Sequence, residues 1–329
     1  MKEIKMSNHP EILKVTQRIK NDEIGGAADT AKELIIALSK MVSETTFTSR
    51  EDLVETIDED VIQILKVMPS LAPPLNALHR VLGRLEEAYA TDISVNELRH
   101  IFIQSCDEFI IWANSAISKV WKYGAEKINN GDVVFTWSMS SSVWGIFREA
   151  KKRGKSFEII VTESSPTYEG FWTVDEMEKA GIPISVSVDA CIGEIIPLCN
   201  LCFVGSDSVS STGYVLNKVG TYPAALVAKT HGIPFYVAAD TLKFDPATLI
   251  GLPYIIETLK RDDILKNKYP DHIKVIGHLF DMTPPELITA VITEIGLVHP
   301  YAAISILMQM KLSNRLNELL PLYVNGNLK

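Results

Sequence analysis

The sequence predicts an α/β protein in which an N-terminal helical domain precedes a Rossmann-like domain with a doubly wound, mostly parallel sheet. Two observations predict this fold class. Up to about residue 123, apolar residues recur at three- and four-residue spacing, which is typical of helices that bury one face. Beyond it, short β-rich runs alternate with helical patterns, which is typical of a parallel sheet covered on both faces. We therefore expect a helical domain over residues 1–123 and a Rossmann-like ligand-binding domain over residues 124–329.

Short breaks divide the helical half into segments. Helical spacing is clearest in AKELIIALSKMV, EDVIQILKVM and LRHIFIQSCDEFIIWANSAISKVW. Breaks with turn or N-cap residues fall at residues 25–26, 43–49, 69–75 and 91–94. This half is therefore predicted to be a helix bundle.

The second half starts after a turn at residues 129–132. Strands are predicted at residues 133–138, 157–163, 184–188, 201–207, 234–239 and 273–280. Helices are predicted to about residue 152, around 174–181, through 193–198 and over 220–231. In such a sheet, ligands bind beyond the carboxyl ends of the strands. This rule selects residues 138–142, 163–166, 189, 207–217 and 240–244.

The composition argues against several classes of function. The chain has 47% hydrophobic and 22% charged residues, as an ordinary globular protein does. Its net charge of −9 and dispersed basic residues offer no broad face for direct nucleic-acid binding. No signal peptide or membrane-spanning run is evident, so we expect a cytoplasmic protein without a membrane partner. Cys199 and Cys202 form a CxxC with no second pair, so we expect them to pack, and we predict no metal site and no cofactor.

Three serines follow the first predicted strand. Ser140, Ser141 and Ser142 stand where that strand passes into a helix, and hydroxyl and N–H groups at a helix start can hold an anion. The alternative is that one serine only caps the helix. The segment alone favours neither interpretation.

Amide and charged side chains follow the later strands. Asn217 and Lys218 precede a second helix start, and Lys243 follows the fifth strand, so together they suit a phosphate or polyhydroxyl ligand. The alternative for each lysine is a solvated surface position. Asp207 closes an apolar strand, where a partly hydrated carboxylate is suited to acid–base work; the alternative is a turn or a cap.

The same segments carry a resemblance to a known family. The runs at residues 133–142, 159–170, 202–244 and 280–303, together with IGGAADTAKELI near the start, resemble the alpha, beta and delta subunits of translation initiation factor 2B. That family also contains the archaeal ribose-1,5-bisphosphate isomerases and the methylthioribose-1-phosphate isomerases. The resemblance covers nearly the whole chain, and residues 207–218 are its most specific part.

The resemblance implies a fold, an assembly and a site. It implies a helical domain joined to a Rossmann-like domain, a sugar-phosphate or nucleotide pocket between them, and dimers that can assemble into hexamers. The family's enzymes isomerise an aldose phosphate to a ketose phosphate with a cysteine and an aspartate, whereas its initiation factors contact initiation factor 2. By this resemblance Asp207 matches the catalytic aspartate, Asn217, Lys218 and Ser140 match ligand contacts, and Ser138 stands at the position of the cysteine.

Departures from the enzyme pattern weaken the catalytic interpretation. An aliphatic hydroxyl is far less acidic than a thiol and needs a separate base, so Ser138 is a poor replacement for cysteine. Arginines of the bisphosphate isomerases are replaced in Gly25–Gly26, at Met68 and within residues 162–166. Each lost charged hydrogen bond weakens phosphate binding by about 1.5–3 kcal/mol.

From the sequence we therefore expect a non-catalytic, initiation-factor-2B-like protein of the alpha-subunit type. It would bind a phosphorylated sugar or nucleotide, form a homodimer or a hexamer, and act through the alpha subunit of initiation factor 2. The alternative is a sugar-phosphate isomerase of the ribose-1,5-bisphosphate type that uses Asp207. A third interpretation is a scaffold whose polar strand-end residues only cap helices. The predicted ligand-binding residues are Gly25, Gly26, Ser140, Ser141, Ser142, Glu163, Asn217, Lys218 and Lys243.

Overall fold

The computed structural model divides the chain into two compact units. It describes residues 8–21, 23–24, 26–68, 72–251, 254 and 256–327, with side chains described as far as residue 320. A helical unit comprises Met1–Ser115 and Gln309–Lys329, and an α/β unit comprises Ala116–Met308. This division differs from the predicted one at residue 123. The boundary falls inside one continuous helix, and the C-terminal segment belongs with the helical unit.

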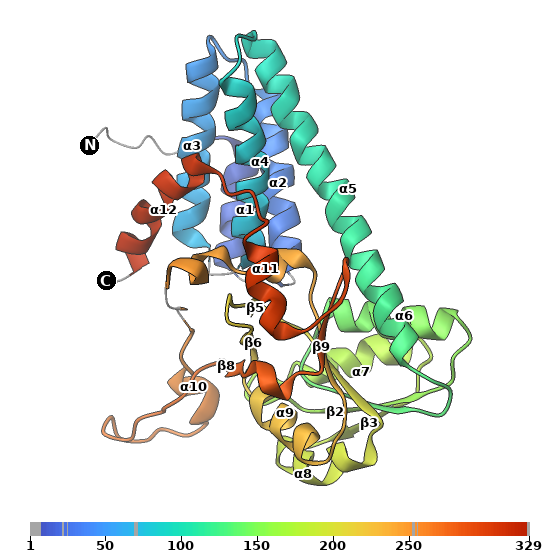
Figure 1. Ribbon diagram of the computed structural model, residues 1–329. Coiled ribbons are helices and arrows are strands. Elements are labelled where there is room, and N and C mark those ends of the chain that lie inside the picture. The colour runs from blue at the N-terminus through green and yellow to red at the C-terminus, as the bar shows by residue number, and fades with distance from the viewer. Residues whose placement is uncertain are drawn as a thin grey trace. The chain divides into compact units, whose positions relative to one another are not determined.

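The helical unit is a bundle of amphipathic helices (Figure 1). Its helices are α1 (Pro10–Lys20), α2 (Ala27–Glu44), α3 (Arg50–Val67), α4 (Ala72–Tyr89), the first part of α5 (Val95–Lys127), and α12 (Asn314–Asn327). Leu34, Leu38 and Leu82 are fully buried between them. Ser94 and Glu97 fix the start of α5 as a capping box, because each side chain accepts the backbone N–H of the other. The predicted helix bundle is thus confirmed.

The α/β unit is built on a sheet of seven strands. In the order β10-β9-β7-β4-β1-β2-β3 they are Gly296–Val298, Ala290–Thr293, Phe235–Ala238, Leu201–Val204, Val133–Thr136, Glu158–Thr162 and Ile184–Ser187. All neighbours pair in parallel except β10 with β9. A second, antiparallel sheet contains β5 (Ser208–Val209), β6 (Val215–Lys218) and β8 (Phe280–Thr283). The Rossmann-like, mostly parallel fold that the sequence predicts is confirmed.

Helices cover the large sheet on both faces. The described helices that follow α5 in this unit are α6 (Ser141–Lys152), α7 (Gly170–Lys179), α8 (Ile192–Ile195), α9 (Thr221–Thr230), α10 (Arg261–Ile264) and α11 (Ala303–Leu307), and of these α6, α7, α8 and α9 flank the sheet (Figure 1). Short 3-10 turns lie at Asp189–Cys191, Ile196–Leu198, Thr241–Lys243, Pro246–Ile250, Pro285–Leu287 and Pro300–Ala302. Figure 1 shows α6 and α7 together on one side of β2 and β3, and α8 with α9 on the other. Phe147 of α6 packs edge-on against Phe203 of β4, which links helix and sheet in one core.

One predicted strand is wrong. Residues 273–280 were expected to continue the large sheet, but only Phe280 of that run belongs to a strand, β8 of the small sheet. Ile276 is 91% exposed, and Gly277 has a φ of 133°, which strand residues with a side chain rarely adopt. The next strand of the large sheet is β9, whose four residues are all buried. Two continuous apolar runs thus lie in this part of the chain, residues 273–280 and Ala290–Thr293, and the second, which is fully buried, forms the strand of the large sheet.

The structure also bears on the cysteines and on membrane-spanning helices. Cys202 is buried within β4, and burial raises the pKa of its thiol, as expected for a packing residue. Among the described residues, no helix combines the length and the apolar character that a membrane crossing requires.

Candidate active site

The strand order creates a switch point between β1 and β4. From β1 the sheet grows through β2 to β3, and from β4 it grows in the opposite direction through β7 to β9. Doubly wound sheets typically bind ligands at the carboxyl edge beside such a switch point. Close approach here requires a glycine: a methyl group at Gly205 would lie 2.6 Å from Ser140 Oγ. The same methyl group would lie 3.8 Å from Asn217 Oδ1, so Ser140 and Asn217, two of the predicted site residues, both lie close to Gly205.

A chain of three polar side chains crosses the edge after β1. The hydroxyl of Ser138 donates to Oε2 of Glu169 at 2.6 Å. The ammonium of Lys218 lies 2.8 Å from Oε1 of the same carboxylate and 4.7 Å from the ring centre of Phe280. Lys218, predicted to bind a ligand, is therefore already engaged. Sequence reasoning missed Glu169, which lies six positions beyond the predicted Glu163.

The loop after β2 holds this arrangement in place. Ser138, Ser164 and Tyr168 all have φ near +60°, a conformation that costs non-glycine residues energy and that clusters at functional sites. The carboxylate of Asp189 accepts the backbone N–H groups of Ser164 at 2.9 Å and Ser165 at 2.7 Å. In turn, Ser164 Oγ accepts the Ser138 N–H at 2.9 Å. Asp189, selected from the sequence only by its strand end, thus supports the loop that carries Glu169.

Asp207 and Lys243 form a second charged group at the same edge. Burial raises the pKa of the Asp207 carboxyl; the positive charges of Lys243 and Lys218 oppose this rise, and Glu169 adds to it. Among the described residues, none donates a hydrogen bond to the Asp207 carboxylate or pairs with it directly. Lys243 is only 8% exposed and also lacks a direct ion pair within the described chain. The polar groups of Asp207 and Lys243 therefore stay available to a ligand.

The second predicted helix start is not free. Asp281 of β8 accepts the backbone N–H groups of Gly220, at 2.7 Å, and Tyr222, at 3.1 Å, and so occupies the N-terminus of α9. Burial raises the pKa of Asp281 to about 6, although these hydrogen bonds oppose the rise. The Asn217 amide donates to Thr221 Oγ1 at 2.9 Å. A carboxylate of the chain itself thus lies where a phosphate would bind this helix start, and ligand binding by Asn217 and Lys218 stays a prediction.

The remaining predicted residues divide into three cases. Ser140 is the N-cap of α6 and accepts the Val143 N–H, so the capping alternative applies to it; Ser141 is exposed and Ser142 is buried in the first turn. The Glu163 side chain makes no hydrogen bond with described residues. Gly26 precedes α2 in the helical unit with φ 91°, and Gly25 lies outside the described residues.

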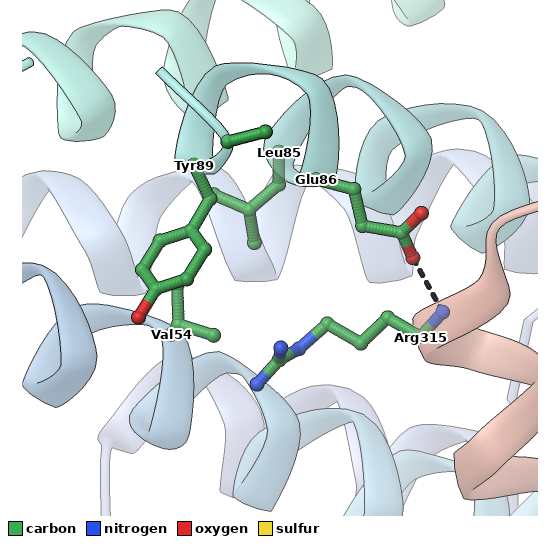
Figure 2. A pocket seen from close by; sticks show the side chains of 6 residues that line it. Val54, Leu85, Glu86, Tyr89 and Arg315 are labelled. Carbon is green, nitrogen blue, oxygen red and sulfur yellow. Dashed lines mark hydrogen bonds between the residues drawn. The ribbon is translucent and has the colours of Figure 1, made fainter. Parts of the chain in front are cut away.

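A pocket in the helical unit was not predicted from the sequence. It is lined by Val54, Leu85, Glu86, Tyr89, Ala90 and Arg315 (Figure 2). Its polar groups are engaged within the unit, since the Arg315 guanidinium binds both oxygens of Asp58 and Glu86 accepts N–H groups at the start of α12. Beside it, burial lowers the pKa of His79 to about 4, and His79 Nδ1 accepts the Ser313 N–H at 3.2 Å. The pocket is therefore a seam where α12 attaches.

Comparisons with known proteins place the chain among relatives of two kinds. The model of the initiation factor 2 subunit family matches residues 23–300. A ribose 1,5-bisphosphate isomerase of Thermococcus kodakarensis is 33% identical over 306 residues, covering 91% of this chain and 94% of that protein. A putative translation initiation factor eIF-2B subunit 2-like protein of Pyrococcus horikoshii is 36% identical over 289 residues, covering 88% and 96%. The crystal structure of translation initiation factor eIF-2B from Pyrococcus horikoshii OT3 has a TM-score of 0.73 and 32% identity, covering 90% of this chain and 99% of that one.

Proposed function

This chain belongs to the initiation factor 2 subunit family, and from that premise we propose that its α/β unit converts an aldose phosphate into the corresponding ketose phosphate. The observation that carries this proposal is Asp207. Its carboxyl lies at the switch point, has a raised pKa and receives no hydrogen bond from a described residue. A carboxyl whose pKa is raised and whose oxygens are free of hydrogen bonds is suited to exchange a proton with a substrate, which is what isomerisation requires.

Lys243 supplies the charge for substrate binding. Its buried ammonium forms no direct ion pair with a described carboxylate. A phosphate can therefore bind this ammonium without displacing a carboxylate. Lys218 differs in this respect because Glu169 already pairs with it. We therefore assign phosphate binding to Lys243 and proton transfer to Asp207.

The sequence favoured a non-catalytic protein, and the relatives support the isomerase alternative more strongly. Several relatives named ribose 1,5-bisphosphate isomerase are 30–33% identical over most of the chain. The loss of arginines still argues that the substrate differs from a bisphosphate. We propose a sugar monophosphate, or a bisphosphate bound weakly, as the substrate class.

A non-catalytic ligand-binding subunit is the second candidate. The relative named as an eIF-2B subunit-like protein favours it, since its identity to this chain is 36%. In that case the chain would form a homo-oligomer and bind a phosphorylated sugar or nucleotide, with the alpha subunit of initiation factor 2 as its partner. A pull-down with that subunit tests the partner.

The test of catalysis is an isomerase assay with a panel of phosphorylated aldoses that includes ribose 1,5-bisphosphate. We expect turnover of at least one sugar, and we expect Asp207→Asn to lower kcat by about 100-fold or more, the usual contribution of an acid–base group. Ligand-induced thermal stabilisation should persist in this variant, because the amide keeps the shape of the site.

Asp175→Asn is the matched control, because this aspartate is exposed on α7. It should leave kcat unchanged. Stabilisation by a sugar phosphate without turnover of any sugar would contradict catalysis and support the second candidate. Absence of stabilisation by every sugar and nucleotide would remove both.

A further inference from the structure

We propose that Glu169 is the base for the Ser138 hydroxyl, so that Ser138 and Glu169 transfer a proton as one unit. This inference rests on the proposed isomerase function and adds a proton-transfer group to it. The sequence contained no partner for Ser138, and a serine hydroxyl alone is too weak an acid to exchange protons near neutral pH. The structure supplies that partner at hydrogen-bond distance.

The contact has the geometry of an activated hydroxyl. Ser138 is 3% exposed, and its Oγ lies 2.6 Å from Glu169 Oε2, within the range of a short hydrogen bond to a carboxylate. Because the carboxylate is the acceptor, the hydroxyl proton points at Glu169. The lone pairs of Ser138 Oγ are thereby left for a proton that arrives from a substrate.

Two hydrogen bonds hold the backbone of Ser138. The Ser138 N–H donates to Ser164 Oγ at 2.9 Å, and Thr173 Oγ1 donates to the Ser138 carbonyl at 2.8 Å. Ser138 itself has φ 59°, a strained conformation held by these contacts. An enzyme group must be positioned in this way before the substrate arrives.

A purely structural role accounts poorly for Glu169. It occupies the N-cap position of α7, yet its side chain makes no capping hydrogen bond there. Instead the carboxylate contacts Ser138 and Lys218. The Glu169 side chain is 14% exposed and the Lys218 side chain is 12% exposed. The rival role is neutralisation of the buried Lys218, and Ser138→Cys in the Glu169→Gln background distinguishes the two roles.

The chemical step balances without a further reactant. The C–H bond next to the substrate carbonyl breaks, and its proton moves to Ser138 Oγ while the Ser138 hydroxyl proton moves to Glu169 Oε2. The electron pair of the C–H bond forms the C=C bond, and the Asp207 carboxyl gives its proton to the former carbonyl oxygen, so that the substrate becomes an enediol. Glu169 then returns one proton through Ser138 to the neighbouring carbon, while the Asp207 carboxylate takes the proton of the substrate hydroxyl that becomes the new carbonyl, and the product is the ketose. Glu169 thus acts through Ser138 as a positioning and proton-accepting residue.

The experiment is a double-mutant cycle on the full chain with the aldose phosphate that the wild type converts. Ser138→Ala and Glu169→Gln should each lower kcat by about 100-fold or more, with KM changed by less than about 3-fold. The double variant should be no slower than either single variant, because the two residues act as one unit. Additive losses would overturn the proposal, as would a Glu169→Gln variant that keeps the wild-type kcat.

A second variant tests the chemistry of the pair. A thiol ionises with a pKa near 8.5 and needs no partner base, so Ser138→Cys should restore at least about 10-fold of kcat in the Glu169→Gln background above pH 8. If Glu169 only neutralised Lys218, the cysteine would restore nothing, and this result would overturn the proposal. Glu178→Gln, an exposed carboxylate of α7, is the control and should keep the wild-type kcat.

The two levels of failure are distinguishable. If the wild type converts no sugar phosphate, the proposed function fails, and the Ser138–Glu169 unit fails with it. If the wild type is active and depends on Asp207 but not on Glu169, only the present inference fails. Thermal unfolding of each variant shows whether a loss of activity comes from a loss of structure.

Discussion

Gly205 directly follows β4, and its lack of a side chain brings two loops of the site together. A methyl group there would lie 2.6 Å from Oγ and 2.8 Å from Cβ of Ser140, and the Cβ atom cannot move away without moving the backbone. We predict that Gly205→Ala lowers the free energy of unfolding by about 1–3 kcal/mol, the usual cost of overpacking. Urea unfolding followed by circular dichroism measures it.

Gly193→Ala is the matched control in the same unit. Gly193 lies in α8, and a methyl group there would meet nothing within 4 Å. Its stability should stay equal or rise by up to about 1 kcal/mol, because alanine favours helix. Equal stabilities for the two variants would show that the close approach at Gly205 does not exist in solution.

Single residues at strand ends were the part of the site that the sequence could predict. Ser138, Asp207 and Lys243 follow apolar strands, and parallel strands place their carboxyl ends at one edge. Glu169 and Asp281 could not be found in this way. Glu169 depends on left-handed turns at Ser164 and Tyr168, and Asp281 reaches α9 through a pairing with Asn217, which is far away in the sequence.

At the scale of elements, the start of α9 depends on the ionisation of Asp281. Burial raises the pKa of its carboxyl to about 6, above the ordinary value of 3.8. The native protein therefore holds this proton more tightly than the unfolded chain does. The stability that this group contributes is full below pH 3.8 and is lost as the pH rises through about 6.

Asp281→Asn should remove that dependence. Relative to the variant, the wild type should lose about 2 kcal/mol in the free energy of unfolding between pH 4 and pH 7, from roughly 1.4 kcal/mol per unit of pKa. Chemical unfolding at a series of pH values measures the difference. Asp271→Asn, at an exposed position, should follow the wild-type curve. A difference between wild type and Asp281→Asn that does not change with pH would refute this role for Asp281.

Most elements could be predicted because their patterns are strongly periodic. The long helices and the strands β1, β2, β3, β4 and β7 each combine a clear pattern with a turn on either side. The strand prediction for residues 273–280 was wrong because an apolar run does not show which sheet it will join. Burial on both faces singles out β9, and burial depends on neighbours that are far apart in the chain.

At the scale of the whole molecule, the chain returns to the helical unit at its end. Helix α12 packs against α3 and α4 of that unit. Leu316 is fully buried there, and Arg315 binds the carboxylate of Asp58. This return could not be predicted from the sequence, because the partners are more than 200 positions apart. A discontinuous unit of this kind is held by contacts that no local pattern encodes.

Deletion of residues 309–329 should therefore destabilise the helical unit selectively. It removes the apolar contact of Leu316 and leaves Asp58, whose pKa burial raises, without Arg315. The Asp58 and Arg315 side chains are 19% and 26% exposed, so loss of this pair should cost more than the roughly 0–1 kcal/mol of a surface pair and less than the roughly 3–5 kcal/mol of a fully buried one. Hydrogen exchange followed by mass spectrometry should show faster exchange of amides in α3 and α4, whereas β1 and β4 of the α/β unit should exchange as in the wild type.

Lys311→Ala is the matched control for this deletion. Lys311 pairs with Glu87 at the surface, where its side chain is 83% exposed, and such a pair contributes about 0–1 kcal/mol. Its exchange pattern should equal that of the wild type. Unchanged protection of α3 and α4 in the deletion variant would mean that these helices are stable without α12. Faster exchange in β1 and β4 as well would mean that the two units lose stability together, and selectivity would be disproved.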